Sequence, residues 1–125
     1  MRSAAAPNNS MNVTLYHKPT CGTCQKVMKA LKEKGAEITA IEYLKTPPSE
    51  AEIDSILKKL KMEPEALART KEPLFQEKFA GKSFSRSEWL KILHDNPILI
   101  ERPIVVMGDR AVVARPPERL AELLK

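Results

Sequence analysis

The stretch NVTLYHKPTCGTCQKVMKALKEKGAEITAIEYL, residues 12–44, decides the fold of this chain. Residues 12–17 are rich in β-branched and aromatic side chains and alternate with polar ones, which predicts a strand. The apolar side chains that follow recur at helical spacing: Val27, Met28 and Leu31. Gly35 supplies a helix stop, and residues 37–44 alternate again. A strand, a helix and a second strand in so short a stretch predict a βαβ unit with parallel strands and a right-handed crossover.

Two further helices are predicted from capping boxes, in which an N-cap serine and a glutamate three residues later exchange hydrogen bonds. The boxes pair Ser49 with Glu52 and Ser85 with Glu88. Between these helices, the segment 63–70 (EPEALART) predicts a short helical piece. The middle of the chain is therefore expected to be helical.

The last quarter of the chain predicts a hairpin and a helix. In residues 102–115 two apolar runs flank Gly108 and Asp109, a pair of residues suited to a tight turn. A final helix is expected from Pro116 onwards, because proline is favoured at helix starts. The order of elements predicts an α/β chain of thioredoxin-like type, with a four-stranded mixed sheet, flanking helices and an inserted helical region at about 47–97.

Length and composition favour one globular domain. With 125 residues, of which 42% are hydrophobic and 30% charged, the chain can bury a core without metals or disulfides. We expect that domain to span 11–125, and the segment 1–10 (MRSAAAPNNS) to be a disordered extension or a tag remnant. The sequence has no apolar run that could cross a bilayer and no secretory signal, so we expect a cytoplasmic protein with no membrane contact.

The basic charge does not indicate a nucleic-acid partner. The formal net charge is +5, but the lysines are mixed with glutamates, as on a solvated helix face. One Trp, two Tyr and three Phe are too few and too scattered for a base-stacking platform. We interpret the lysines as solubilising, with a weak attraction for anions.

The two cysteines, Cys21 and Cys24, allow three interpretations. A structural zinc site takes about four ligands, and the chain offers only two cysteines and two histidines, one of which, His94, lies far along the sequence. No metal site is therefore expected. A structural disulfide would close a very short loop in a reducing compartment, where it stabilises little.

A redox centre fits these cysteines better. Cys21 lies where the first strand passes into the helix, so the N–H groups and dipole of the helix favour its thiolate. Cys24 lies one turn further on, within reach of the Cys21 sulfur. A C-x-x-C pair at this position predicts thioredoxin-like redox chemistry. His17 either orients or deprotonates a nearby thiol, or is a strand-end imidazole bonded to a carbonyl.

Four blocks of sequence carry a resemblance to a known family. They are LYHKPTCGTCQ (15–25), LARTKEP (67–73), NPILIERPIVV (96–106) and VVARPPE (112–118). In this order and spacing they resemble the arsenate reductases of the glutaredoxin-coupled type, over nearly the whole of residues 12–125. The resemblance implies an enzyme that reduces arsenate to arsenite through a cysteine thiolate.

The resemblance also implies roles for single residues. Cys21 matches the family's nucleophile, and His17 matches a histidine that precedes it. Pro103 matches the cis-proline of thioredoxin-like folds. The blocks place the three arginines that surround the oxyanion in that family at Arg69, Arg102 and Arg115. Guanidinium forks suit a tetrahedral oxyanion such as arsenate, although each arginine taken alone could equally form a weak surface ion pair.

One departure from the family is informative, because Cys24 stands where those enzymes typically carry a serine. The family uses glutathione and glutaredoxin to release the arsenic adduct. Here Cys24 could instead attack Cys21, leaving a disulfide for thioredoxin or glutaredoxin to reduce. No bound cofactor is expected, only such an external reductant and a small oxyanion substrate.

Two other functions stay open. One is a redox-sensing transcriptional regulator of the Spx type, which binds the α-subunit of RNA polymerase and also carries a C-x-x-C pair. The block with Arg115 and the chain's stop after the last helix disfavour it. The other is a general thiol-disulfide reductase.

Overall fold

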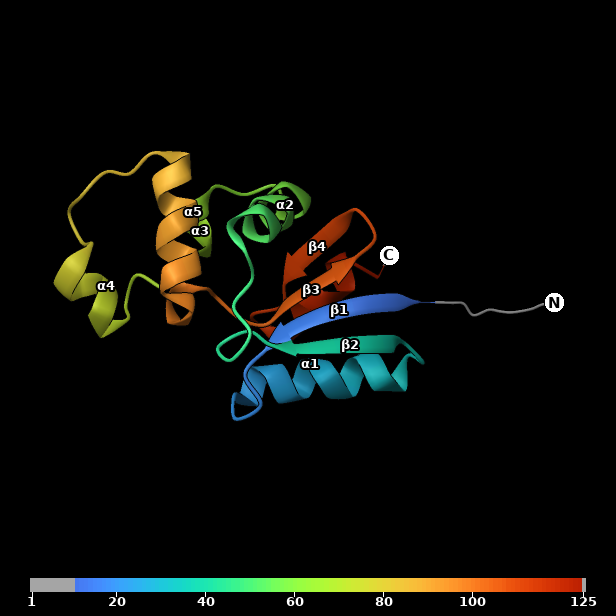
Figure 1. Ribbon diagram of the computed structural model, residues 1–125. Helices are drawn as coiled ribbons and strands as arrows, with labels where there is room; N and C mark the ends of the chain where they lie inside the picture. Colours follow the sequence, from blue (N-terminus) through green and yellow to red (C-terminus); the bar gives the residue numbers. More distant parts are fainter. Residues whose placement is uncertain (1–10, 125) are drawn as a thin grey trace. The chain divides into compact units, whose positions relative to one another are not determined.

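The computed structural model of the chain describes residues 11–124 in two compact units (Figure 1). Residues 11–42 and 102–124 form the first unit, and Tyr43–Glu101 forms the second. The extension or tag remnant expected at 1–10 lies outside the described residues. That 11–125 is one domain with an insertion at about 47–97 stays a prediction.

The first unit contains a four-stranded mixed sheet in the order β2-β1-β3-β4 (Figure 1). The strands are β1 (Asn12–His17), β2 (Glu37–Glu42), β3 (Ile104–Met107) and β4 (Arg110–Val113). β1 pairs with β2 in parallel and with β3 antiparallel, and β3 and β4 form the hairpin. The predicted thioredoxin-like sheet is confirmed, although β2 ends two residues before the expected 44.

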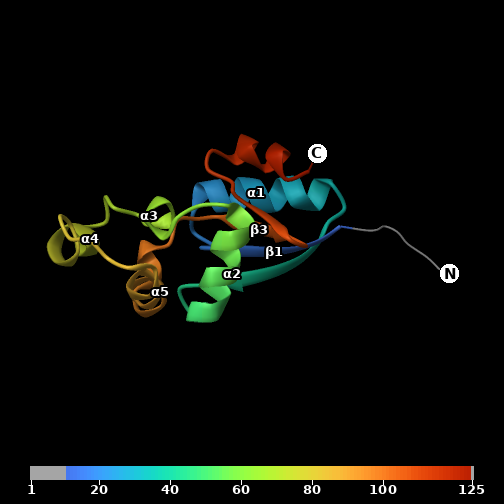
Figure 2. The ribbon, with the colours of Figure 1, turned by 90° about the horizontal axis from the view of Figure 1, so that it is seen from above.

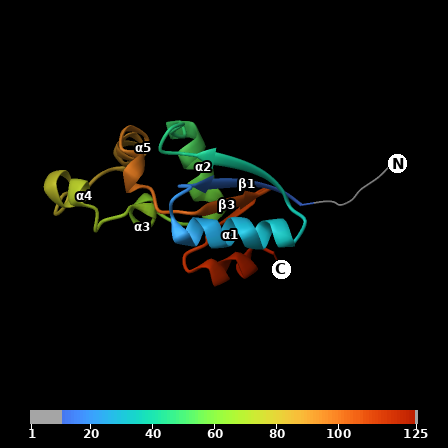
Figure 3. The same cartoon turned by 90° about the horizontal axis from the view of Figure 1, so that it is seen from below.

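Two helical segments cover one face of this sheet: α1 (Gly22–Glu33) and the 3-10 helix η3 (Pro117–Glu122) (Figures 2 and 3). Gly35, with a φ of 76°, adopts the left-handed conformation that ends α1 and turns the chain into β2. The core beneath consists of buried aliphatic side chains: Val13, Leu15, Val27, Leu31, Val105, Val112, Ala114, Leu120 and Leu123. The sheet and α1 therefore hold the first cysteine at a rigid junction.

The last helix differs from the expected α-helix. Arg119 N–H donates to the carbonyl of Pro116, and Leu123 N–H donates to that of Leu120, both at 3.0 Å. These are i→i+3 bonds, which short helical pieces commonly adopt. The apolar spacing of this segment fits either helix type, so it could not distinguish them.

The second unit is helical, with α2 (Glu50–Leu60) packed against α5 (Arg86–Asp95). Both predicted capping boxes are present, at Ser49 and Ser85, with the serine and glutamate bonds formed in both directions. Arg86 on α5 forms an ion pair with Asp54 on α2 at 2.7 Å. These contacts confirm the two long predicted helices.

Shorter elements of this unit depart from the expectation. The helical piece expected at 63–70 shrinks to α3 (Pro64–Leu67), because Ala68 leaves the helix and forms a β-bridge with Ile100. The other two short elements are α4 (Pro73–Lys78), which was not predicted, and the 3-10 helix η2 (Pro97–Leu99). Both begin with a proline, whose missing N–H costs nothing at a helix start.

All three phenylalanines and the single tryptophan gather in this unit. The rings of Phe75 and Trp89 stack with centroids 6.1 Å apart and an interplanar angle of 9°. Phe79 and Phe84 complete the cluster by tilted and edge contacts. Within residues 11–124, no helix is both long enough and apolar enough to cross a membrane.

Candidate active site

The two cysteines lie at the start of α1 with different exposure. Cys21 is the N-cap residue of α1, in an extended conformation, and its own N–H donates to the carbonyl of Lys18 at 2.9 Å. Its side chain is partly exposed. Cys24, three residues into the helix, is 1% exposed. Both are free thiols. One sulfur can therefore meet a ligand from solvent while the other stands behind it.

The surroundings of Cys21 favour its thiolate. Partial burial raises the pKa of Cys21, but hydrogen bonds from the Cys24 backbone and thiol, from Arg102 and from the Thr23 backbone outweigh it. The net effect lowers the pKa of Cys21 to about 7. Because an ordinary cysteine titrates at about 8.5, this sulfur is ionised to a useful degree at neutral pH.

Cys24 is shifted in the opposite direction. Burial is the largest effect and raises the pKa of Cys24, which a hydrogen bond from the Lys18 backbone partly offsets. The hydrogen bond to Cys21 and the negative charge of its thiolate raise this pKa further, the charge of Arg102 lowers it, and the net pKa is about 11. At neutral pH Cys24 is therefore a neutral thiol, and Cys21 is the thiol of the pair that ionises. Two thiols one turn apart thus have distinct chemical states.

Two arginines reach this junction because of the sheet topology. Tyr16, near the end of β1, pairs with Ile104, at the start of β3, and Ile104 in turn pairs with Val113, at the end of β4. Residues that precede β3 or follow β4 therefore lie at the sheet edge from which Cys21 extends. Arg102 and Arg115 are those residues.

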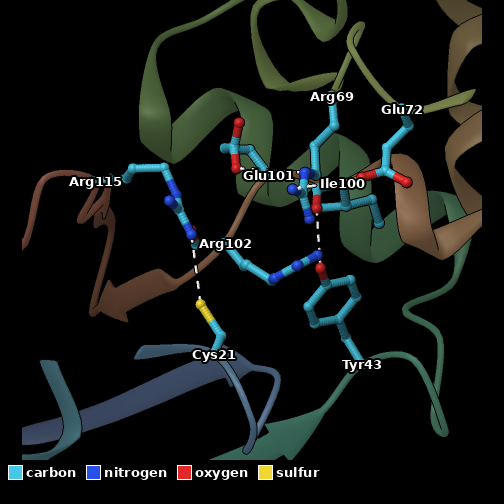
Figure 4. Close-up of polar contacts among 8 residues, drawn as sticks. All are labelled: Cys21, Tyr43, Arg69, Glu72, Ile100, Glu101, Arg102 and Arg115. Carbon is cyan, nitrogen blue, oxygen red and sulfur yellow. Dashed lines mark hydrogen bonds and ion pairs between the residues drawn. The ribbon is translucent and has the colours of Figure 1, made fainter. Parts of the chain in front are cut away.

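Arg115 contacts the nucleophile candidate directly (Figure 4). Its Nη2 donates to the Cys21 sulfur at 3.4 Å, and its Nε donates to the Arg102 carbonyl at 2.9 Å. The second bond fixes the guanidinium plane. The Arg102–Pro103 and Arg115–Pro116 peptide bonds are both cis. A thiolate, a helix N-terminus and guanidinium groups together can bind a small oxyanion and attack its central atom.

Arg69 belongs to the second unit, and its partners there are acidic (Figure 4). Its Nη2 lies 3.4 Å from a Glu72 oxygen, and its Nε lies 3.7 Å from a Glu101 oxygen. Its backbone N–H donates to the carbonyl of Leu99 at 2.7 Å. The side-chain Nη1 is buried with no hydrogen-bond partner in the described part of the chain. Its predicted contact with the oxyanion stays a prediction.

Comparison with known proteins assigns the chain to a family. The model of the ArsC family matches residues 16–123. This chain belongs to the ArsC family. The resemblance found in the four sequence blocks is thereby confirmed.

Similar proteins include one named as uncharacterized and others named arsenate reductase. The uncharacterized protein YfgD of Escherichia coli K12 is 39% identical, over 90% of this chain and 96% of its own length. An arsenate reductase of Yersinia enterocolitica is 35% identical, over 90% of this chain and 81% of that protein. A solved structure of an arsenate reductase from Vibrio cholerae matches with a TM-score of 0.87 and 36% identity, over 91% of this chain and 98% of that one.

His17 lines a groove that none of Arg69, Arg102 and Arg115 lines. It ends β1 and shares this surface groove of about 600 Å³ with Cys24 and the side of α1. This groove was not predicted from the sequence, although Gln25, Met28, Lys29 and Lys32 fall at helical spacing on one side of α1. In the described part of the chain, no three His, Cys, Asp or Glu side chains gather in a way that could hold a metal ion.

Proposed function

We propose that this ArsC-family chain is an enzyme that reduces arsenate to arsenite with Cys21 as nucleophile. The observation that carries the proposal is the Cys21 sulfur, with a pKa lowered to about 7 and a guanidinium donor of Arg115 at 3.4 Å. Proteins similar to the chain over most of its length bear the name arsenate reductase. This supports assigning the same substrate to this chain.

In the first step the Cys21 thiolate attacks the arsenic atom of arsenate. A sulfur–arsenic bond forms, and one oxygen leaves as water after taking up a proton. Arg115 and Arg102 are proposed to hold the remaining oxygens, since a guanidinium offers paired donors and keeps its charge at any working pH. Positive charge placed where the adduct gathers negative charge lowers the barrier.

In the second step Cys24 attacks the Cys21 sulfur. The electron pair of the sulfur–arsenic bond passes to arsenic, arsenite leaves, and a Cys21–Cys24 disulfide forms. Part of the raised pKa of Cys24 is due to the Cys21 thiolate, and that part disappears once the sulfur binds arsenic. We assign His17 as acceptor of the Cys24 proton, since both residues line the same groove.

Arg69 is the third proposed oxyanion ligand. Its buried Nη1 offers a donor that Glu72 and Glu101 do not use. An isolated buried donor costs about 1–3 kcal/mol unless something accepts its hydrogen bond, and an anion would do so. The two acidic partners neutralise much of its charge, so we expect Arg69 to contribute less than Arg115.

The disulfide must then be reduced from outside, because the proposed reaction leaves both cysteines oxidised. A dithiol protein, thioredoxin or glutaredoxin, is the proposed partner, and no bound cofactor takes part. The alternative route uses glutathione and glutaredoxin on the arsenic adduct itself, with Cys24 as a bystander.

The test is NADPH oxidation coupled to a thioredoxin or glutaredoxin system in the presence and absence of arsenate. We expect arsenate-dependent turnover, abolished in Cys21→Ser. Cys24→Ser should fail with thioredoxin; full turnover of that variant with thioredoxin would rule out the disulfide route, and turnover only with glutathione and glutaredoxin would establish the alternative. If there were no turnover at all and the chain captured RNA polymerase, the assignment as an enzyme would be wrong and the assignment as a transcriptional regulator would take its place.

A further inference from the structure

The groove beside α1 is distinct from the arginine-lined side of the cysteine pair. Cys24 and His17 lie at one end of it, and its walls continue along α1. At 1.5 Å per residue, the helix segment from Cys24 to Lys32 is about 12 Å long. None of Cys21, Arg102 and Arg115 lines it. The oxyanion therefore meets the pair at the partly exposed Cys21, whereas a second molecule seated in the groove lies beside the buried Cys24.

The chemistry of the groove favours a polypeptide with acidic side chains. Met28 and Pro19 provide apolar surface next to the buried Cys24, and the exposed Lys29 and Lys32 provide positive charge. One acidic residue, Glu33, also lines it. A groove with an apolar floor and lysines along its rim accepts an extended segment that pairs acidic side chains with apolar ones.

We infer that this groove docks an acidic segment of the dithiol protein that reduces the Cys21–Cys24 disulfide. The inference rests on the proposed function, because it assumes that this disulfide forms. A thiolate of the docked partner attacks the disulfide and forms a mixed disulfide, and one cysteine leaves as thiolate. The partner's second thiol then displaces the other cysteine. Two thiols form here, and the partner leaves as the disulfide, so electrons and protons balance.

The test measures the docking step without arsenate. The chain is first oxidised to the Cys21–Cys24 disulfide with diamide, and its reduction by an acidic thioredoxin, kept reduced with NADPH and thioredoxin reductase, is followed as a second-order rate constant. The groove variant is Lys29→Glu/Lys32→Glu. The control variant is Lys26→Glu/Lys34→Glu, which makes the same change in charge at exposed lysines that do not line the groove.

We expect the rate constant for reduction by thioredoxin to be about tenfold lower for the groove variant than for the wild type. With neutral dithiothreitol as the reductant, the two proteins should have similar rate constants. Added salt should slow the wild type and have little effect on the groove variant. An equal fall in both double variants would mean that the net charge acts rather than the groove, and it would overturn the inference. The inference would also be overturned if thioredoxin reduced the groove variant as fast as the wild type. The same holds if dithiothreitol, too, reduced the groove variant about tenfold more slowly.

The result separates the inference from the proposed function. If thioredoxin reduction depends on Lys29 and Lys32 but arsenate supports no turnover, the docking groove stands and the substrate assignment fails. If arsenate turnover is seen but neither double variant changes disulfide reduction, the enzyme stands and the groove has no part in recycling.

Discussion

The ionisation of Cys21 can be tested with two substitutions of Cys24 that differ in one hydrogen bond. The thiol of Cys24 is among the groups that lower the pKa of Cys21 to about 7, together with its backbone N–H. Cys24→Ser keeps a side-chain donor, whereas Cys24→Ala removes it. Either variant leaves Cys21 as the only thiol, so alkylation reports this residue alone.

The expected effect follows from the fraction of thiolate at pH 7. A thiol with a pKa of about 7 is half ionised there, and one with the ordinary pKa of about 8.5 is ionised to about 3%, a ratio of about 15. Cys24→Ala loses one of four stabilising bonds, so its alkylation by iodoacetamide at pH 7 should slow severalfold, with about 15-fold as the ceiling. Cys24→Ser should stay near the wild-type rate.

The pH profile gives the sign of the effect. Because the pKa of Cys21 is lowered, its thiolate is present above pH 7 and is lost as the pH falls through 7. The alkylation rate of Cys24→Ser should therefore rise to a plateau with a midpoint near that pH, and the midpoint of Cys24→Ala should move toward 8.5. Identical midpoints in the two variants would refute the role given to the Cys24 thiol. A midpoint near 8.5 in both would refute the reactive thiolate itself.

Substitutions at Arg115, Ser49 and Leu31 test the site and the fold. Arg115→Ala should lower kcat/KM for arsenate by about 10–100-fold. Arg115→Lys should recover only part of this loss, because lysine lacks the paired donors of the guanidinium. If the alanine variant were as active as the wild type, the proposed contact of Arg115 with the substrate would be contradicted. Ser49→Ala should lower the free energy of unfolding by about 1 kcal/mol in urea, whereas the mid-helix Ser55→Ala should not lower it. Leu31→Ala, at a fully buried position, should cost about 2–5 kcal/mol in the same measurement, and a cost below 1 would contradict the packing of α1.

Local signals in the sequence predicted the elements that depend on local physics. The serines of the two capping boxes, Ser49 and Ser85, begin helices because their bonds close within four residues. The βαβ unit and the hairpin at Gly108 follow in the same way from periodicity and turn chemistry. Gly108 indeed has a φ of 63°, where residues with a Cβ are disfavoured.

Contacts across the chain could not be predicted from spacing alone. Arg115 and Cys21 are 94 residues apart, and only the strand order brings them to one edge of the sheet. Arg115 was recognised as a site residue through the family resemblance and not from the composition of the chain. α4 was missed because its six residues are too short for a period to show. The groove was missed because its lysines look like an ordinary solvated face until the apolar neighbours beside them are known.

Trp89, which stacks on Phe75, is an intrinsic fluorescence probe of this chain. Trp89 is the only tryptophan, it is 5% exposed, and it belongs to the helical unit, whereas both thiols belong to the sheet unit. Tryptophan emission during denaturation therefore follows the helical unit, and the reactivity of the thiols follows the sheet unit. If the two signals change at the same urea concentration, the two units unfold cooperatively; if they change at different concentrations, the units unfold separately.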